Sequence, residues 1–138
     1  MIILAVDYGD VRTGLAVCDP GQMLASPIGT VTQRDADLLI EEICRIARER
    51  SAKRIVVGEP VNMDGSRGER AQKCAEFAAR LQKASGLPCD LWDERCTTVM
   101  AHKALNVTNT RGKKRKQVVD ALSAVLILEG YMTRRFEE

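Results

Sequence analysis

The stretch Ile2-Ile3-Leu4-Ala5-Val6-Asp7 decides the fold of this 138-residue chain. Its continuous apolar run is typical of a β-strand that is buried on both faces. Asp7 then ends the run with a carboxylate at the edge of the core. An unpaired carboxylate in such a place is costly, so we expect a compensating cation beside Asp7.

Two further strands are predicted to follow directly. Gly9 and Asp10 turn the chain, and a second strand runs from Thr13 to Cys18. A third strand runs from Leu24 to Thr32, and Pro27 favours an edge position for it because proline cannot donate a ladder hydrogen bond. Three short strands in succession predict an antiparallel meander.

Helices and strands alternate after this meander. Asp35 can cap a helix in which apolar residues recur at helical spacing, and short strands are predicted at 54–58 and 89–92. The helix between these two strands begins at Ser66–Glu69, which has the spacing of a capping box, and ends at Gly86.

The last third of the chain is predicted to be helical around a polar loop. A short helix runs from Thr97 or Thr98 to about Leu105, a basic loop follows, and a final helix runs from about Gln117 to Thr133. The whole pattern predicts a single α/β domain over residues 1–138. Its sheet is mixed, and its first three strands are antiparallel.

Composition bounds the class of protein. Hydrophobic residues make up 45% and charged residues 29% of the chain, as in soluble globular proteins. No apolar segment approaches the roughly 20 residues that cross a bilayer, and the amino terminus has no signal-peptide features, so we expect a cytoplasmic protein with no membrane partner. The five cysteines form no C-x-x-C pair, which favours reduced thiols over a zinc site or disulfides.

Three carboxylates stand out because each ends or interrupts an apolar run: Asp7, Glu94 and Asp120. Hard oxygen ligands from distant segments, in a chain with one histidine, favour Mg²⁺ or Mn²⁺ and therefore metal-assisted phosphoryl chemistry. Each acid also has an ordinary explanation. These are a hairpin turn, a solvated ion pair and a favourable charge at a helix N-terminus, respectively.

Two local features refine this interpretation. Strand parity can send only one of Asp93 and Glu94 inward, and the sequence does not say which. Gly9 and Gly14 would let a phosphate or metal approach the backbone between the first two strands.

The run from Arg111 to Lys116 concentrates five positive charges in a chain whose net charge is only +2. Such a run is often a solvated loop, but its place just before Asp120 favours contact with phosphate. It has no apolar face to bury, so we expect it to be mobile without substrate.

Four segments together resemble the YqgF/RuvX family of pre-16S rRNA nucleases, which are also described as Holliday-junction-resolvase-like. They are D-Y-G-D-V-R-T-G-L-A-V from Asp7, V-G-E-P-V-N-M-D-G from Val57, D-E-R-C-T-T from Asp93, and D-A-L-S-A-V-L-I-L-E from Asp120. Each segment is modest alone, but this order and spacing over nearly the whole chain are specific.

The resemblance implies an RNase H-like fold with a five-stranded mixed sheet, a central first strand and helices on both faces. It places Asp7, Glu94 and Asp120 as the catalytic acids that hold two divalent ions, Mg²⁺ or Mn²⁺. The residues expected to contact substrate are Arg12, Asn62, Arg95, Thr98, Lys113, Lys114, Arg115 and Lys116.

Glu59 departs from the family pattern, which usually has an apolar residue at this position. RuvC-type resolvases use a carboxylate at that strand end as a metal ligand, so Glu59 is either a fourth acid or a surface substitution. We favour the surface substitution.

The function implied is that of a metal-dependent endonuclease that processes pre-16S rRNA, with the ribosome precursor as partner. The alternatives are a Holliday-junction DNA resolvase and a non-catalytic RNA-binding module; retention of all three acids argues against the module. An actin-like kinase or ATPase would need two such domains, and 138 residues supply one. The sequence does not decide whether the substrate is RNA or branched DNA. It also leaves open the cleavage position, the metal and the oligomeric state.

Overall fold

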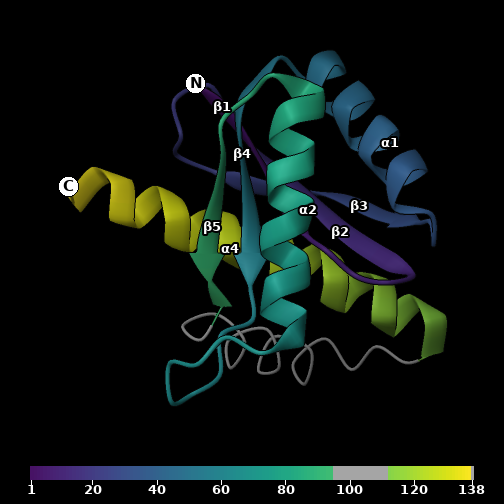
Figure 1. Cartoon of the computed structure of the whole chain (residues 1–138). Coiled ribbons are helices and arrows are strands. Elements are labelled where there is room, and N and C mark those ends of the chain that lie inside the picture. The colour runs from purple at the N-terminus through teal and green to yellow at the C-terminus, as the bar shows by residue number, and fades with distance from the viewer. Residues whose placement is uncertain (95–111, 138) are drawn as a thin grey trace.

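A computed structural model describes residues 1–94 and 112–137, with side chains for residues 1–94 and 121–134. Figure 1 shows the helices and strands of the chain. The elements in chain order are β1 (Ile2–Asp7), β2 (Arg12–Cys18), β3 (Ala25–Thr32), α1 (Ala36–Glu49), β4 (Ala52–Glu59), α2 (Glu69–Ser85), β5 (Cys89–Asp93) and α4 (Gly112–Glu137).

The five strands form one mixed sheet in the order β3-β2-β1-β4-β5. β1 pairs antiparallel with β2, and β2 pairs antiparallel with β3, while β4 lies parallel to both β1 and β5. The predicted mixed sheet is therefore confirmed, and so is the edge position of the strand that contains Pro27. Because β1, β4 and β5 are parallel, their carboxyl ends meet at one edge of the sheet, which we call the carboxyl edge.

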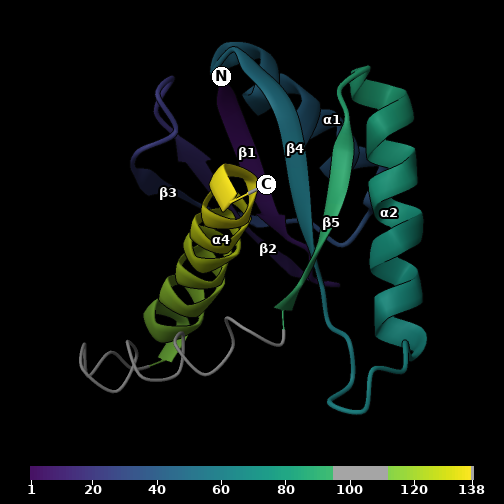
Figure 2. The ribbon, with the colours of Figure 1, turned by 90° about the vertical axis from the view of Figure 1, so that its left-hand side faces the viewer.

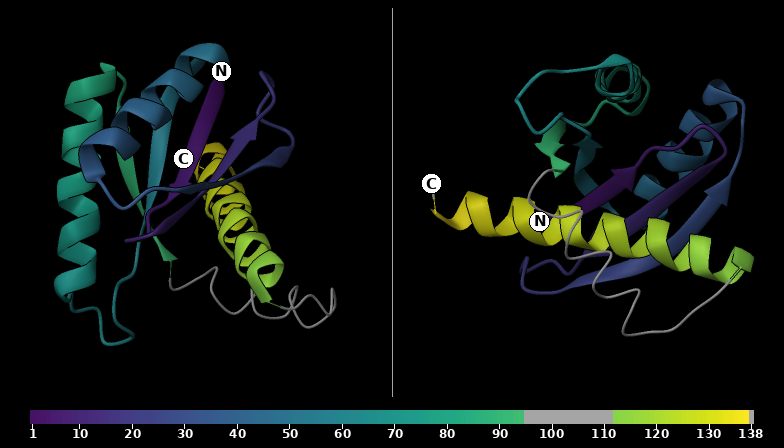
Figure 3. Two further views of the ribbon diagram at one scale, coloured as in Figure 1. Left: turned by 90° about the vertical axis from the view of Figure 1, so that its right-hand side faces the viewer. Right: turned by 90° about the horizontal axis from the view of Figure 1, so that it is seen from below.

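Helices cover both faces of the sheet. In Figure 2 and Figure 3, α4 lies on one side of the sheet, and α1 and α2 lie on the other. β1 supplies both cores in alternation: Leu4 and Val6 pack towards α1 and α2, while Ile3 and Ala5 pack towards α4. All four are fully buried, as expected for a strand covered on both faces. By the same alternation Asp7 faces α4.

The helix boundaries confirm one predicted cap and correct another. Asp35 caps α1, and its carboxylate accepts hydrogen bonds from the backbone N–H groups of Asp37 and Leu38 at 2.9 and 3.1 Å. The predicted capping box at Ser66 is wrong: α2 has Gly68 as its N-cap, with no side-chain cap among the described residues. Asp64 binds the Ser66 hydroxyl at 2.6 Å and its backbone N–H at 2.9 Å, so Ser66 belongs to the preceding turn.

The final helix begins earlier than expected. α4 starts at Gly112 rather than about Gln117, so residues 112–116 are helical and not the loop that we predicted. Lysine and arginine are good helix formers, and extending an existing helix costs far less than starting one. The predicted helix from Thr97 to Leu105 lies outside the described residues. Nowhere in the described ranges is a helix both long and apolar enough to traverse a bilayer.

Candidate active site

Asp7 and Glu94 meet at the carboxyl edge of the sheet, and their carboxyl groups are hydrogen-bonded to each other. Burial raises the pKa of Glu94 above its usual value of 4.5, and the negative charge of Asp93 adds to this shift. The hydrogen bond with Asp7 and the positive charge of Arg70 act in the opposite direction. The pair is thus a partly desolvated acidic site built from two distant segments.

The alternation of β5 explains why Glu94 rather than Asp93 points inward. Asp90 and Trp92 face α4: Asp90 accepts a hydrogen bond from the Tyr131 hydroxyl, and the rings of Trp92 and Tyr131 meet edge to face at 6.4 Å. Glu94 continues this face, where its side chain crosses β4 at Gly58 and lies beside α4. The structure therefore resolves the alternative that strand parity had left open.

Asp120 lies in α4, the helix that covers this same face. It is four residues before Ala124 and seven before Ile127, both of which are fully buried against the sheet. Helical spacing puts all three positions on one stripe of the helix. The side chain of Asp120 is outside the described set, so its meeting with Asp7 and Glu94 stays a prediction.

The carboxyl oxygens of Asp7 and Glu94 are of the chemical type that binds a hard divalent cation. Within residues 1–94 and 121–134, no cluster of three or more His, Cys, Asp or Glu side chains is arranged to hold a metal. Asp7 and Glu94 supply two carboxyl groups, and oxygen ligands are those that Mg²⁺ and Mn²⁺ prefer. A hydrogen bond between two carboxyl groups requires a proton on one of them, and a cation between them would take over that role.

Glu59 is buried, with 5% of its surface exposed, so our expectation of a surface substitution is wrong. It shares its face of β4 with Ile55 and Val57, which pack towards α1 and α2, on the opposite side of the sheet from Asp7. There it accepts an ion-paired hydrogen bond from Nε of Arg67 at 3.2 Å. The alternation of β4 therefore directs Glu59 away from the Asp7–Glu94 pair.

Arg70 is a residue at the site that sequence reasoning missed. It donates to the carboxylate of Asp10 at 2.8 Å and to the carbonyl of Tyr8, and its guanidinium lies 4.8 Å from the centre of the Tyr8 ring. Tyr8 in turn stacks on Phe77 at 4.0 Å. Arg70 thus ties the loop after Asp7 to α2. These contacts join segments about 60 residues apart in the sequence, so no local signal could have identified Arg70.

Gly9 has a structural role in the turn after β1. A Cβ atom added at Gly9 would lie 2.0 Å from the carbonyl oxygen of Arg12, so the turn admits no side chain there. The Gly9 N–H donates to the hydroxyl of Thr13 at 3.3 Å, which further closes the turn. The approach of a phosphate or metal to the backbone at Gly9 and Gly14 stays a prediction.

The structure describes the side chains of only two of the residues that we expect to contact substrate. Arg12 is half-buried at the start of β2, on the carboxyl edge. Asn62 lies in the loop after β4, where its amide donates to the hydroxyl of Ser66 at 3.0 Å. Lys113, Lys114, Arg115 and Lys116 belong to the first turns of α4, without described side chains. Arg95 and Thr98 lie outside the described residues.

Cys74 is buried in the core between α2 and the sheet. Burial raises the pKa of its thiol to about 11, and the negative charges of Glu94, Asp7 and Glu59 add to this shift. A thiol held in its neutral form is a poor nucleophile, which agrees with a packing role for Cys74.

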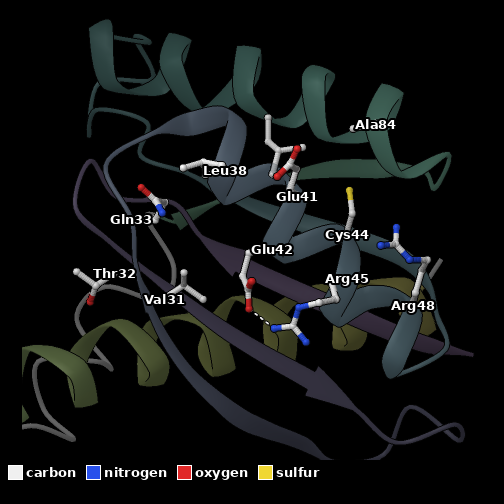
Figure 4. Close-up of a pocket in the computed structure, with 11 residues that line it drawn as sticks. Val31, Thr32, Gln33, Leu38, Glu41, Glu42, Cys44, Arg45, Arg48 and Ala84 are labelled. Atoms are coloured by element: carbon white, nitrogen blue, oxygen red, sulfur yellow. Dashed lines mark hydrogen bonds and ion pairs between the residues drawn. The ribbon is translucent and has the colours of Figure 1, made fainter.

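A separate pocket of about 750 Å³ lies beside α1, on the face opposite to the Asp7–Glu94 pair. Figure 4 shows its lining, in which Glu42 binds Arg45 within the same helix. Arg45 also binds Glu49 at 2.7 Å. These charges neutralise one another along an exposed helix surface. We therefore place the chemistry at the acid pair rather than in this pocket.

Sequence comparison gives matches over nearly the whole chain. A family model described as RuvX, Holliday junction resolvase, matches residues 1–134. A relative from Lachnospira eligens is 44% identical over 135 residues, which cover 96% of each protein. A relative from Clostridium novyi is 39% identical over 132 residues, covering 96% of this chain and 98% of the relative. Both bear the name "Putative pre-16S rRNA nuclease".

Two solved resolvases share the fold. RuvC of T. thermophilus in complex with Holliday junction substrate aligns with a TM-score of 0.63 at 13% identity, covering 99% of this chain and 96% of that chain. The Fowlpox virus resolvase in complex with Holliday junction DNA aligns with a TM-score of 0.61 at 11% identity, covering 98% and 99%. At these identities the likeness concerns the fold, which is RNase H-like as expected.

Proposed function

The chain belongs to the RuvX family, and from this membership we propose that it is a divalent-metal-dependent nuclease that cleaves phosphodiester bonds in pre-16S rRNA. The observation that carries the proposal is the hydrogen-bonded pair of Asp7 and Glu94 at the carboxyl ends of parallel strands. Ligands of open α/β sheets gather at such ends. The names of the relatives favour a ribosomal precursor as substrate, which would place the activity in the cytoplasm.

The acids would act by holding positive charge. Asp7 and Glu94, joined by Asp120 from α4, would give up their shared proton and bind two Mg²⁺ or Mn²⁺ ions. When bound, such ions activate a water molecule and stabilise the departing oxygen of an in-line displacement. These carboxylates come from the end of β1, from the residue after β5 and from α4, so their positions would not depend on a single loop.

The residues around the acids would position the acids and the substrate. Arg70 fixes the loop that follows Asp7, because it binds Asp10, the Tyr8 carbonyl and the Tyr8 ring together. The residues that we propose to hold the phosphate backbone, with little reading of bases, are Arg12, Asn62, Arg95, Thr98, Lys113, Lys114, Arg115 and Lys116. Asn62 would act from the loop that its own hydrogen bond to Ser66 orders.

A Holliday-junction resolvase is the second candidate, because the matching family model is described by that activity. A non-catalytic RNA-binding module is the third. All three functions would place a phosphodiester backbone at the carboxyl edge, and they differ in the nucleic acid bound and in whether it is cut.

A cleavage assay separates the three. It compares a 16S rRNA precursor, a four-way DNA junction and single-stranded RNA, each with Mn²⁺ and with chelator. The proposal predicts Mn²⁺-dependent cleavage of the precursor, lost in an Asp7→Asn variant. Cleavage of the junction alone would favour the resolvase. Binding of RNA without cleavage under any condition would favour the binding module.

A further inference from the structure

Asp7 and Glu94 are hydrogen-bonded although a whole strand lies between them. Asp7 ends β1, Glu94 directly follows β5, and β4 lies between β1 and β5 in the sheet. A side chain on β4 that faced α4 at this level would stand in the path of the Glu94 side chain. The residue at that position is Gly58, because Val56, two residues earlier, faces α4.

The space at Gly58 is fully taken. A Cβ atom added there would lie 2.8 Å from Cδ and 3.0 Å from Cγ of Glu94, and 2.5 Å from Cδ1 of Ile127. Among the described residues, the glycines of positive φ are Gly29, Gly65 and Gly86, so the backbone of Gly58 does not itself require glycine. The demand for glycine at this position therefore comes from its neighbours and not from its own conformation.

We infer that Gly58 is a positioning residue whose missing side chain gives Glu94 its passage across β4 to Asp7. The two atoms nearest to an added Cβ are Cδ1 of Ile127, in α4, and Cδ of Glu94, after β5. Ile127 is fully buried in the core between α4 and the sheet. Glu94 follows the last residue of β5 and is only half-buried, so its carboxyl group is the more easily displaced of the two.

The expected consequence is a loss of site geometry without a loss of fold. A methyl group at Gly58 would move the Glu94 carboxyl group away from Asp7 and leave the sheet intact. The effect on metal binding rests on the proposed function, but the effect on the Asp7–Glu94 contact does not. These two effects can therefore be measured separately.

The Ile127→Val variant makes the test selective, because this change deletes Cδ1, the atom nearest to an added Cβ at Gly58. Crystal structures of Ile127→Val and of Gly58→Ala/Ile127→Val are compared, together with melting curves and Mn²⁺ affinity by calorimetry. In the double variant we expect a cooperative melting transition, a broken Asp7–Glu94 contact, and Mn²⁺ affinity lower by about tenfold or more, as for other changes that misorient a metal ligand.

Two controls identify Glu94 as the group through which Gly58 acts. At Gly68 an added Cβ would meet only the amide nitrogen of Asn62, at an ordinary 3.6 Å, so Gly68→Ala should keep the Mn²⁺ affinity of the wild type. In a Glu94→Ala background, adding Gly58→Ala should lower the Mn²⁺ affinity no further.

The outcomes that overturn the inference are distinct from those that overturn the proposed function. An intact Asp7–Glu94 contact in the Gly58→Ala/Ile127→Val structure would refute the role of Gly58, whatever the wild type binds. Failure of that variant to fold would also refute it, since the core rather than Glu94 would then require the space. A wild type that binds no Mn²⁺ would refute the proposed function, while the two crystal structures still decide the role of Gly58.

Discussion

The carboxyl groups of Asp7 and Glu94 share a hydrogen bond above the backbone of Gly58. This contact joins the first strand of the sheet to the residue after the last one. Two carboxyl groups in such contact repel each other once both are ionised, so a proton or a cation must stabilise them.

The raised pKa of Glu94 predicts how stability depends on pH in the absence of divalent ions. The folded state holds the Glu94 proton at pH values where the unfolded chain has lost it, so stability falls as the pH rises from the usual pKa of 4.5 through the raised pKa of the folded state. Glu94→Gln removes this titration. The melting temperature of Glu94→Gln minus that of wild type should therefore increase as the pH rises through that range.

The control for this measurement is Glu41→Gln, a change at an exposed residue on α1. Its melting temperature should run parallel to that of wild type over the same pH range. A parallel course for Glu94→Gln as well would contradict the assignment of a raised pKa to Glu94.

Replacing Asp7 by Asn should abolish metal-dependent cleavage and keep the fold. The amide retains the shape of the side chain but lacks the charge that would hold a cation. Because it also removes carboxylate repulsion from Glu94, the melting temperature without metal should rise slightly. Cleavage with Mn²⁺ and thermal melting are the measurements. Full activity in material free of contaminating nuclease would mean that the chemistry lies elsewhere.

Glu59 should matter for the loop and not for the metal, since it faces away from Asp7. Glu59→Leu should leave Mn²⁺ affinity unchanged. Arg67→Ala should lower the free energy of unfolding by about 1–3 kcal/mol, because this change leaves the buried carboxylate of Glu59 without its ion pair. Glu59→Leu removes that carboxylate and should destabilise the protein less. Calorimetry and urea unfolding measure the two effects. A drop in Mn²⁺ affinity in Glu59→Leu would show that Glu59 is a metal ligand after all.

Much of this fold follows from local patterns in the chain. The five apolar residues before Asp7 predict a strand covered on both faces, and Pro27 predicts an edge strand, because both depend only on burial and on ladder hydrogen bonds. The Asp35 cap is equally local. The start of α4 was misjudged because charged residues were interpreted as loop, although a helix anchored by its apolar part extends readily through lysine and arginine.

The site was less predictable, because it depends on which strands are neighbours. The order of the sequence motifs predicted Asp7 and Glu94 as site residues. The space that Gly58 leaves for the Glu94 side chain can be recognised only once β4 is known to lie between β1 and β5. Glu59 was misjudged for the same reason: its burial follows from the cover that α2 gives to one face of β4. The contacts of Arg70 join α2 to the loop after β1, and no local pattern predicts such a pairing of distant elements.

The basic residues at the start of α4 should contribute affinity rather than chemistry. Replacing Lys113, Lys114 and Arg115 by glutamine, which is also a good helix former, removes charge and keeps the helix. RNA binding should weaken, and the slope of log affinity against log salt should become shallower by roughly 0.7 for each lost contact to a single strand. Cleavage at saturating RNA should change much less.

The matched control neutralises Lys73 and Lys83, two exposed residues on α2, which lies on the other face of the sheet. A uniform loss of positive charge would affect both variants through long-range attraction, whereas direct phosphate contacts would affect only the α4 variant. Binding is measured by titration at several salt concentrations for wild type and both variants. An unchanged slope in the α4 variant would show that this turn of helix points its charges into solvent, and the phosphate backbone would then have to be held by Arg12 and the other residues of the carboxyl edge.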